Sequence, residues 1–437
     1  MSCSRRQFLR VALTGVAAVP AWGMSAAGLA LSSAGYSSAD DALLDEVEHR
    51  AFEFFWNEAH PATGMVFDRT HAEGGGRSAK ASIAATGFGL TALCIGHERA
   101  YRPRIQIEER IARTLAFIAA EAQTEHGFLY HFVQPDSGRR YRMSEVSPID
   151  MAILLSGVLT CREYFQDKQI QRDATEIYKR IEWPWMLADG RYFSLDWRPE
   201  LGFSHLRWDA YCESMMLYLL ALGSPTHPIS ADCWHAIRRP AMVYGEYKYI
   251  SIPAPLFVHQ FSHAWFDFRD KHDEHANYFL NSVRASRAHR EFCIELGNKF
   301  PSYSKDVWGI TASVSSAGYV AWGGPPMVGP IDGTVVPAAS AGSLPFIFPE
   351  ALAVSRNLKA RYGNRVWKRY GFVDAFNPLT GWVSSDVLGI DLGITMLMAE
   401  NARTGFVWNH FMNSPEVAVS MDRAGFLPDG FEVPQLA

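Results

Sequence analysis

The chain has 437 residues, of which 48% are hydrophobic and 20% charged, so it can bury a large core and is not a disordered protein. Its formal net charge is −5 and it has no long basic run, which excludes the electrostatic footprint of a nucleic-acid-binding protein. Aromatic residues make up 13% of the chain, more than a core alone usually needs. Sugar binding would use the surplus, because sugar faces stack on aromatic rings.

The N-terminal segment is typical of an export signal. A twin-arginine pattern at Arg5 and Arg6 precedes an apolar, small-residue stretch, Val11–Ala30. This order predicts a Tat-type signal peptide over residues 1–34 and a periplasmic mature protein. An uncleaved anchor is the alternative, but the stretch is rich in Ala and Gly rather than Leu and Ile, so we expect removal and no stable membrane insertion.

The rest of the chain, residues 38–437, is expected to form a single domain, since no linker or low-complexity segment divides it. Apolar residues at spacings of three and four predict helix after helix. The strand signals are short, at Gly127–Phe132 and Gly190–Leu195. About a dozen helices without a strong repeat suggest an all-α toroid with short β segments in its loops, although periodicity alone leaves other all-α arrangements open. The predicted helices are Asp41–Trp56, Ser82–Glu98, Gln106–Ala122, Pro148–Phe165, Arg172–Ile181, Ala210–Leu222, Ala276–Lys299, Ala351–Tyr362 and Leu392–Phe411.

Cysteines and histidines give no sign of a disulfide framework, a metal or a cofactor. Beyond Cys3 the cysteines are odd in number and lack metal-ligand spacing; they are Cys94, Cys161, Cys212, Cys233 and Cys293. His259, His263 and Asp267 have the i, i+4 spacing of metal ligands, but no HExxH-like pattern accompanies them. We therefore expect neither a metal nor a cofactor.

Glu213 is the most informative acid, because it lies at the start of an apolar helical run within Trp208–Ile229. One interpretation is a first-turn acid that the exposed N–H groups of the helix favour. The other is a catalytic acid, because Trp208, Tyr211 and Tyr218 surround it in the sequence, and aromatic pockets raise carboxyl pKa values.

Other acids also precede apolar helices. Glu145 and Asp150 lie before Met151, and Asp391 lies before Leu392. In a toroid with parallel inner helices these ends share one rim, so the acids would converge with Glu213. Glycoside hydrolysis needs such a pair of carboxyl groups, and their separation decides between inversion and retention.

The sequence resembles the bacterial glycoamylase-like family, whose members with known activity are largely β-1,2-glucan hydrolases and whose relatives form part of cyclic β-1,2-glucan synthases. The resemblance covers nearly the whole mature chain in one order and implies an (α/α)6 barrel. Its motifs are FFWNEAHPATGMVFD (54–68), SIAATGFGLTAL (82–93), GFLYH (127–131), EVSPID (145–150), the Glu213 segment, QFSHAWFDFR (260–269), WGITAS (308–313), DGTVVPAASAGS (332–343), YGFVDAFN (370–377) and GIDLGITMLMAENARTGFVW (389–408).

The resemblance implies a periplasmic glycoside hydrolase that acts on β-1,2-glucan or its oligosaccharides without a cofactor. Glu213 would be the general acid, and Asp391 or Asp150 the base acting through water, with Glu145 as a further candidate. The implied substrate-binding residues are Asp68, Arg69, His131, Arg207, Trp208, Tyr211, His263, Trp265, Trp308, Asp374 and Asn377.

Some positions depart from the family pattern. Some relatives have an acid where this chain has Ser147, so either Glu145 replaces it or the water is held differently. Ile394 stands where relatives often have Pro. Asp374 and Asn377 have a second interpretation as residues that cap the turn before Leu379.

Two other functions share these features. A transglycosylase would use the same acids but exclude the hydrolytic water, and a non-catalytic glucan-binding protein would lack the base. Endo or exo action, stereochemistry and oligomeric state are left open by the sequence.

Overall fold

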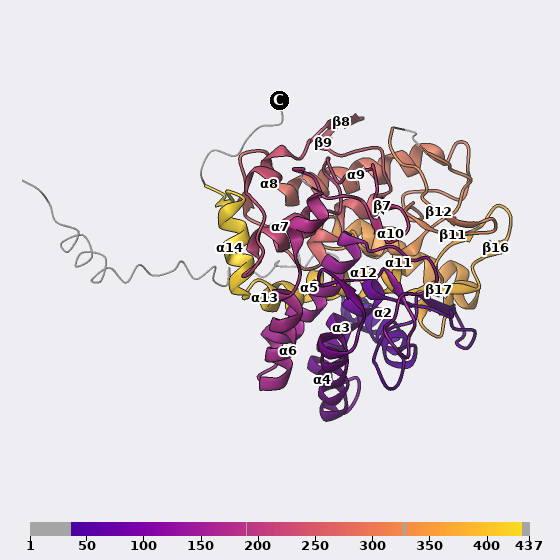
Figure 1. The fold of residues 1–437 in the computed structure, drawn as a ribbon. Helices are drawn as coiled ribbons and strands as arrows, with labels where there is room; N and C mark the ends of the chain where they lie inside the picture. Colours follow the sequence, from indigo (N-terminus) through magenta and orange to yellow (C-terminus); the bar gives the residue numbers. More distant parts are fainter. Residues whose placement is uncertain (1–35, 189, 327–328, 431–437) are drawn as a thin grey trace, which may run out of the picture. The chain divides into compact units, whose positions relative to one another are not determined.

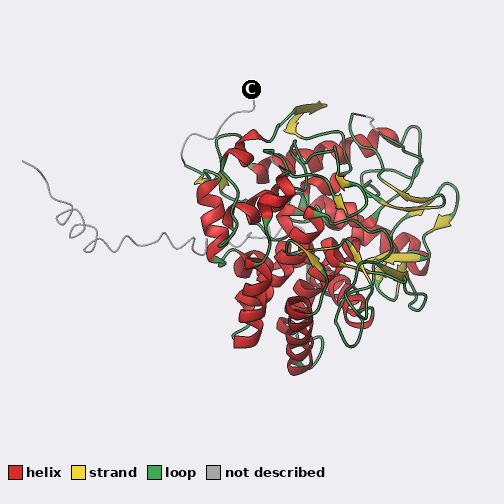
Figure 2. Cartoon of the chain, in the orientation of Figure 1, coloured by secondary structure: helices red, strands yellow, loops and turns green. Residues whose placement is uncertain are grey.

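Helices dominate the computed structural model, which describes residues 36–188, 190–326 and 329–430 (Figure 2). The expected export signal, residues 1–34, lies outside these residues. The α-helices of the described residues are α2 (Ser38–Asn57), α3 (Ile83–Glu98), α4 (Arg104–Ala120), α5 (Pro148–Tyr164), α6 (Lys168–Lys179), α7 (Met215–Gly223), α8 (Asp232–Ala236), α9 (Tyr278–Leu296), α10 (Pro337–Ala341), α11 (Phe348–Tyr362), α12 (Gly389–Arg403), α13 (Phe406–Phe411) and α14 (Pro415–Arg423).

Inner and outer helices alternate along the chain. The inner helices α3, α5, α7 and α12 bury nearly every side chain, whereas the outer helices α4 and α6 bury one face and leave the other in solvent. Between α7 and α12 along the chain, two short 3-10 turns, Leu256–His259 and Ser262–Ala264, are also largely buried. α12 packs against α2 and α3, which closes the ring (Figure 1). The α/α toroid expected from the sequence is confirmed.

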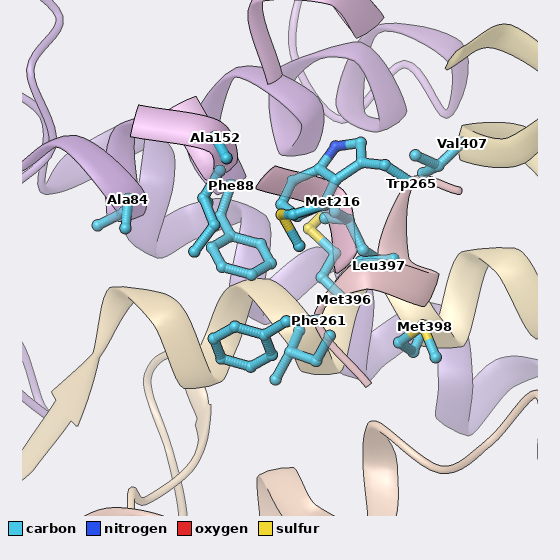
Figure 3. Packing of buried hydrophobic residues seen from close by; sticks show 14 of the residues in the cluster. Ala84, Phe88, Ala152, Met216, Phe261, Trp265, Met396, Leu397, Met398 and Val407 are labelled. Atoms are coloured by element: carbon cyan, nitrogen blue, oxygen red, sulfur yellow. The ribbon is translucent and has the colours of Figure 1, made fainter. Parts of the chain in front are cut away.

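The centre of this ring is filled by side chains (Figure 3). Phe88 of α3 lies with its ring centroid 4.9 Å from that of Trp265 and 5.6 Å from that of Phe261. Met216 of α7 and Met396 of α12 point toward the same group, and all five side chains are buried. Because no space for a polar ligand is left there, a functional site must lie at an end of the ring.

Two glycines let the inner helices α3 and α5 approach closely. A Cβ atom at Gly157 would lie 2.1 Å from the carbonyl oxygen of Gly87, well inside van der Waals contact. The two backbones touch at this point, which only glycine allows.

Short two-stranded ladders join the loops between the helices. β1 pairs with β17 and β2 with β5, so loops that precede different inner helices are hydrogen-bonded to one another. The strands are β1 (Arg69–His71), β2 (Ala81–Ser82), β3 (Thr124–Glu125), β4 (Phe128–Leu129), β5 (Phe132–Val133), β6 (Trp197–Arg198), β7 (Gly202–Phe203), β8 (Ala241–Tyr244), β9 (Tyr247–Ile250), β10 (Lys271–His272), β11 (Ser313–Ser315), β12 (Gly318–Val320), β13 (Trp367–Lys368), β14 (Gly371–Phe372), β15 (Phe376–Asn377), β16 (Trp382–Val383), β17 (Asp386–Leu388) and β18 (Leu427–Pro428).

Most predicted helices are present, with three corrections. The helix expected from Ala210 begins only at Met215, because residues 211–214 form turns. The helix expected over Leu392–Phe411 is two helices, separated by Gly405 with φ 69°. Residues 190–195 form no strand but one isolated bridge, at Ser194. Within the part of the chain that is described, none of the helices has the length and apolar character needed to span a bilayer.

Candidate active site

Three of the predicted acids lie at the N-terminal ends of inner helices. Asp150 is in the first turn of α5, Asp391 is in the first turn of α12, and Glu213 is in the turn just before α7. Ser147 caps α5, since its side chain accepts a hydrogen bond from the Asp150 N–H. This capping role accounts for a serine at the position where some relatives have an acid.

The loops in front of these helices are joined by backbone hydrogen bonds. The N–H of Gly389, at the start of α12, donates to the Asp68 carbonyl at 3.0 Å. The N–H of His131 donates to the Glu145 carbonyl at 2.8 Å, in the loop before α5. Val146 in turn forms a bridge with Trp197. The predicted shared rim is therefore formed by hydrogen-bonded neighbouring loops.

Glu213 is buried and has an unusually weak acid group. Its side chain is 9% exposed, and burial, with a smaller contribution from the negative charge of Asp150, raises its pKa to about 7. The Ser262 hydroxyl holds the turn by donating to the Glu213 carbonyl oxygen at 2.7 Å. The residue that precedes α7 directly is Ser214, and no side chain caps this helix. Glu213 thus precedes α7 and does not lie in its first turn, so the interpretation as a first-turn acid is wrong.

His131 links the two acids that precede α5. Its Nδ1 lies 2.7 Å from Glu145 Oε1, and its Nε2 lies 3.5 Å from Asp150 Oδ1. Burial alone would raise the pKa of Glu145, but the hydrogen bond and charge of His131, together with Arg198, lower it to about 2. Burial disfavours the charged imidazole, yet Asp150 and Glu145 raise the pKa of His131. With a pKa this low, the ionised Glu145 carboxylate has little affinity for a proton and is a poor candidate for the base.

Asp374 and Asp391 form a second acidic pair. Both are buried, and burial raises the pKa of Asp374 to about 6 even though the carboxyl of Asp391 donates a hydrogen bond to it. Burial and the charge of Asp374 raise the pKa of Asp391 well above its usual range. The Val314 N–H donates to Asp374 Oδ2 at 2.7 Å and holds the ionised partner. Of the two carboxyl groups, Asp391 therefore holds its proton more tightly than Asp374.

Asp68 and Arg69 lie between the two acidic groups. The Arg69 guanidinium donates to Asp68 at 3.0 Å and lowers the pKa values of both Asp374 and Asp391. The charge of Asp68 acts on His131 as well. Five of the predicted residues are thus brought together with Glu213, Asp150 and Glu145; they are Asp68, Arg69, His131, Asp374 and Asp391.

Tyr319 is a residue of this region that the sequence analysis missed. It lies on β12 and is 53% exposed, yet desolvation of its hydroxyl and the charges of Asp391 and Asp374 raise its pKa. The hairpin of β11 and β12 thus brings an exposed ring close to the second acidic pair. An available signal was Gly318, which lies five residues after the end of the family motif at Ser313 and closes the turn of this hairpin.

Four predicted sugar-binding residues are instead part of the core. The Tyr211 hydroxyl is paired with His259, the His263 ring with Ser282, and the Trp265 indole donates to Thr91, and all three predicted residues are at most 1% exposed. Trp308 is 0% exposed. The assignment of Tyr211, His263, Trp265 and Trp308 to substrate binding is wrong, because these side chains have no surface that faces solvent.

Asn377 and Tyr218 have structural roles. Asn377 Oδ1 accepts hydrogen bonds from the N–H groups of Leu379 and Thr380, so the turn-capping alternative is confirmed for Asn377. Tyr218 is buried and donates to the Trp208 carbonyl at 2.7 Å, which anchors the loop before Glu213.

Arg207 and Trp208 flank this loop. The Arg207 guanidinium donates to carbonyl oxygens of its own loop, including Leu206 at 3.0 Å, and Trp208 is half-buried. Sugar contact by these two residues stays a prediction.

The sequence is similar to a known family and to a relative of known activity. The family model named Glycoamylase, described as "Putative glucoamylase", matches residues 205–415. An exo β-1,2-glucooligosaccharide sophorohydrolase (non-reducing end) of Parabacteroides distasonis is 28% identical over 89% of this chain and 58% of its own length.

Two solved structures have the same fold. An endo-β-1,2-glucanase from Chitinophaga pinensis, in complex with sophorotriose and glucose, has a TM-score of 0.84 and 26% identity, covering 90% of this chain and 99% of its own. A β-1,2-glucanase from Parabacteroides distasonis has a TM-score of 0.84 and 26% identity, covering 89% of this chain and 60% of its own.

These matches confirm the class that the fold and the acids define, an α/α-toroid protein with the motifs of a carbohydrate-active enzyme. The resemblance to the bacterial glycoamylase-like family is confirmed as well. The chain spans 58% of the length of the sophorohydrolase that it matches.

Proposed function

We propose that this chain is a glycoside hydrolase that cleaves β-1,2-glucan or its oligosaccharides. One observation carries the proposal: Glu213 is a buried acid whose pKa is raised to about 7 by burial and, to a smaller extent, by the charge of Asp150. Proteins that cover about nine-tenths of the chain at 26–28% identity are β-1,2-glucan hydrolases. A carboxyl group that stays protonated near neutral pH has the property that a general acid needs.

In the proposed reaction Glu213 gives its proton to the glycosidic oxygen as the bond to the anomeric carbon breaks. A base removes a proton from the water that attacks this carbon, so the second carboxyl group must be ionised at the start. Asp391 does not meet this condition, because it holds the shared proton of its pair with Asp374, and we therefore assign the base to Asp150. His131, paired with Asp150 at 3.5 Å, would orient the base.

Asp391 is then assigned to substrate binding together with Asp374, Asp68 and Arg69. The proton of Asp391 is used in its bond to Asp374, but Asp391 Oδ2 and Asp374 Oδ1 have no hydrogen-bond partner, so each can accept a hydrogen bond from a sugar hydroxyl. Tyr319, half-exposed beside them, offers a ring face on which a sugar can stack.

The test uses purified mature protein with linear and cyclic β-1,2-glucan, and other β-glucans as controls, with products resolved by size. Shorter β-1,2-linked products from β-1,2-glucan alone support the proposal. Cleavage of β-1,3- or β-1,4-glucan with none of β-1,2-glucan contradicts it.

The same experiment separates the alternatives. A transglycosylase would yield cyclic or elongated products, and a glucan-binding protein would bind the polymer yet release no reducing ends. Glu213 favours a catalytic protein, since burying an acid without a partnering cation costs folding free energy that binding alone does not require.

We also propose that the protein acts in the periplasm. The support is the twin-arginine pattern at Arg5 and Arg6 before the apolar stretch Val11–Ala30. Cell fractionation tests it, and a full-length protein confined to the cytoplasm would contradict it.

A further inference from the structure

A cluster of two histidines and a glutamate lies on a part of the chain that the proposed reaction does not use. His235 is on α8, and Glu274 and His275 are in the turn that precedes α9. No metal was expected from the sequence, because 39 positions separate His235 from Glu274 and no short spacing joins them.

The three side chains present one ligand atom each to a common point. His235 Nδ1 lies 2.7 Å from Glu274 Oε1 and 3.5 Å from His275 Nε2, and His275 Nε2 lies 3.3 Å from the same Glu274 Oε1. Zinc binds histidine nitrogen at about 2.0–2.1 Å in a tetrahedron, so its ligand atoms lie about 3.3 Å apart. Two of the three distances already have this value, and the third opens by a small movement of the exposed Glu274 side chain.

The two segments are held by a buried carboxylate behind them. Asp273 is 1% exposed, and its Oδ1 accepts hydrogen bonds from the N–H groups of His275 and Ala276 at 2.8 and 2.9 Å. Its Oδ2 accepts from the Trp234 indole at 2.9 Å, next to His235. Both halves of the cluster are therefore fixed to one anchor, so little conformational entropy remains to be lost when a cation binds.

The ligand atoms of this cluster favour a transition metal such as zinc over calcium or magnesium. Two imidazole nitrogens and one carboxylate oxygen suit zinc, whereas calcium and magnesium prefer oxygen ligands alone. The side chains of His235 and His275 are 35% and 27% exposed, which leaves a path for the ion and room for water as a fourth ligand.

We propose that His235, Glu274 and His275 form a zinc-binding site that clips α8 to the turn before α9. The clip lies close in sequence to the catalytic loop: Arg238, three residues after His235, accepts a hydrogen bond from the Tyr211 N–H at 2.8 Å, two residues before Glu213. The site is structural, and no step of glycoside hydrolysis passes through it.

The test is calorimetric titration of tag-free, EDTA-treated mature protein with zinc chloride, followed by thermal unfolding with and without zinc. We expect one saturable equivalent and a rise in Tm. His235→Ala and His275→Ala should each weaken zinc binding by at least about tenfold, since even the loss of an outer-shell partner costs about that much. His227→Ala, at an exposed histidine whose ring is hydrogen-bonded to Thr226, is the matched control and should bind like wild type.

A further variant guards against misfolding. Glu274→Gln changes a side chain that is 65% exposed, so the fold should be kept while a charged ligand is lost. Absence of zinc binding to wild type overturns the proposal, as does binding that is equally tight in His235→Ala, His275→Ala and Glu274→Gln.

Discussion

Glu213→Gln tests the central assignment, because it keeps the shape of the side chain and removes the proton donor. We expect kcat on β-1,2-glucan to fall by about 10² to 10⁴, the usual contribution of a general acid. In wild type the acid must be protonated, so activity should decline as the pH rises through about 7, the pKa of Glu213.

The same substitution has a predictable effect on stability. Burial raises the pKa of Glu213 from 4.5 to about 7, which corresponds to about 3 kcal/mol at about 1.4 kcal/mol for each tenfold change in proton affinity. Below pH 4.5 the carboxyl is protonated in both the folded and the unfolded chain. Between pH 4.5 and 7 only the folded chain keeps the proton, so the free energy of unfolding falls as the pH rises. Above pH 7 the carboxyl of Glu213 is ionised in the folded chain as well, and the loss of unfolding free energy reaches its full value of about 3 kcal/mol.

Glutamine does not ionise, so the unfolding free energy of the variant does not fall with pH through this side chain. Relative to wild type, Glu213→Gln should therefore gain up to about 3 kcal/mol between pH 5 and pH 8. Urea unfolding at both pH values measures the difference, and kcat is measured on the same samples. Glu109→Gln, at an exposed acid of α4, is the control and should change neither quantity.

Two results would refute this reasoning. Wild-type kcat in Glu213→Gln would mean that the residue is not the acid. A stability difference that does not depend on pH would mean that the carboxyl of Glu213 is not desolvated in the folded protein.

Three further predictions follow from the acids, the leader and the packing. Asp150→Asn should abolish hydrolysis and leave glucan binding intact, whereas Asp391→Asn should chiefly raise KM; steady-state kinetics and calorimetry distinguish them, and equal small losses would contradict both roles. Replacing Arg5 and Arg6 with Lys should keep the precursor in the cytoplasm, while wild type should appear in the periplasm shortened by roughly 25 to 35 residues; immunoblots of cell fractions decide. Gly157→Ala should lower the free energy of unfolding by about 1–3 kcal/mol or more, because its Cβ would lie 2.1 Å from a backbone oxygen of α3; unchanged urea unfolding would contradict the close approach.

The toroid was predicted from the number of helices and from the resemblance to the glycoamylase-like family, and the structure shows why its inner helices differ from the outer ones. A helix such as α7, in which all nine residues are buried, differs visibly from a one-sided helix such as α6. The acids of the rim were found for a related reason, since each is a polar residue directly before an apolar run. Helix boundaries were less secure: the turns at residues 211–214 have no signal that propensity alone reveals.

The aromatic residues could not be assigned in the same way. Trp265 and Tyr211 lie near polar motifs in the sequence, but a side chain near a motif can point to the core or to the rim, and only packing decides. Tyr319 and the His235 cluster were missed for a different reason. Their partners are distant in the sequence, and no short spacing joins them.

The pKa values at the rim show that burial outweighs the position of a residue near a helix. The N-terminal end of a helix favours a carboxylate by about 0.3–1 kcal/mol, up to about 2 in partly buried sites. Asp391 lies in the first turn of α12, yet its pKa is raised well above the usual range, because desolvation and the neighbouring Asp374 oppose ionisation more strongly. Glu145 is half-buried, but its pKa falls to about 2, since His131 supplies a hydrogen bond and a positive charge. The pKa values of Asp391 and Glu145 differ because Asp391 faces another carboxyl group, whereas Glu145 faces a histidine. An acid that is buried at this rim without a cation holds its proton more tightly and can donate it, as we propose for Glu213, whereas Glu145, paired with His131, is ionised and serves as an anchor.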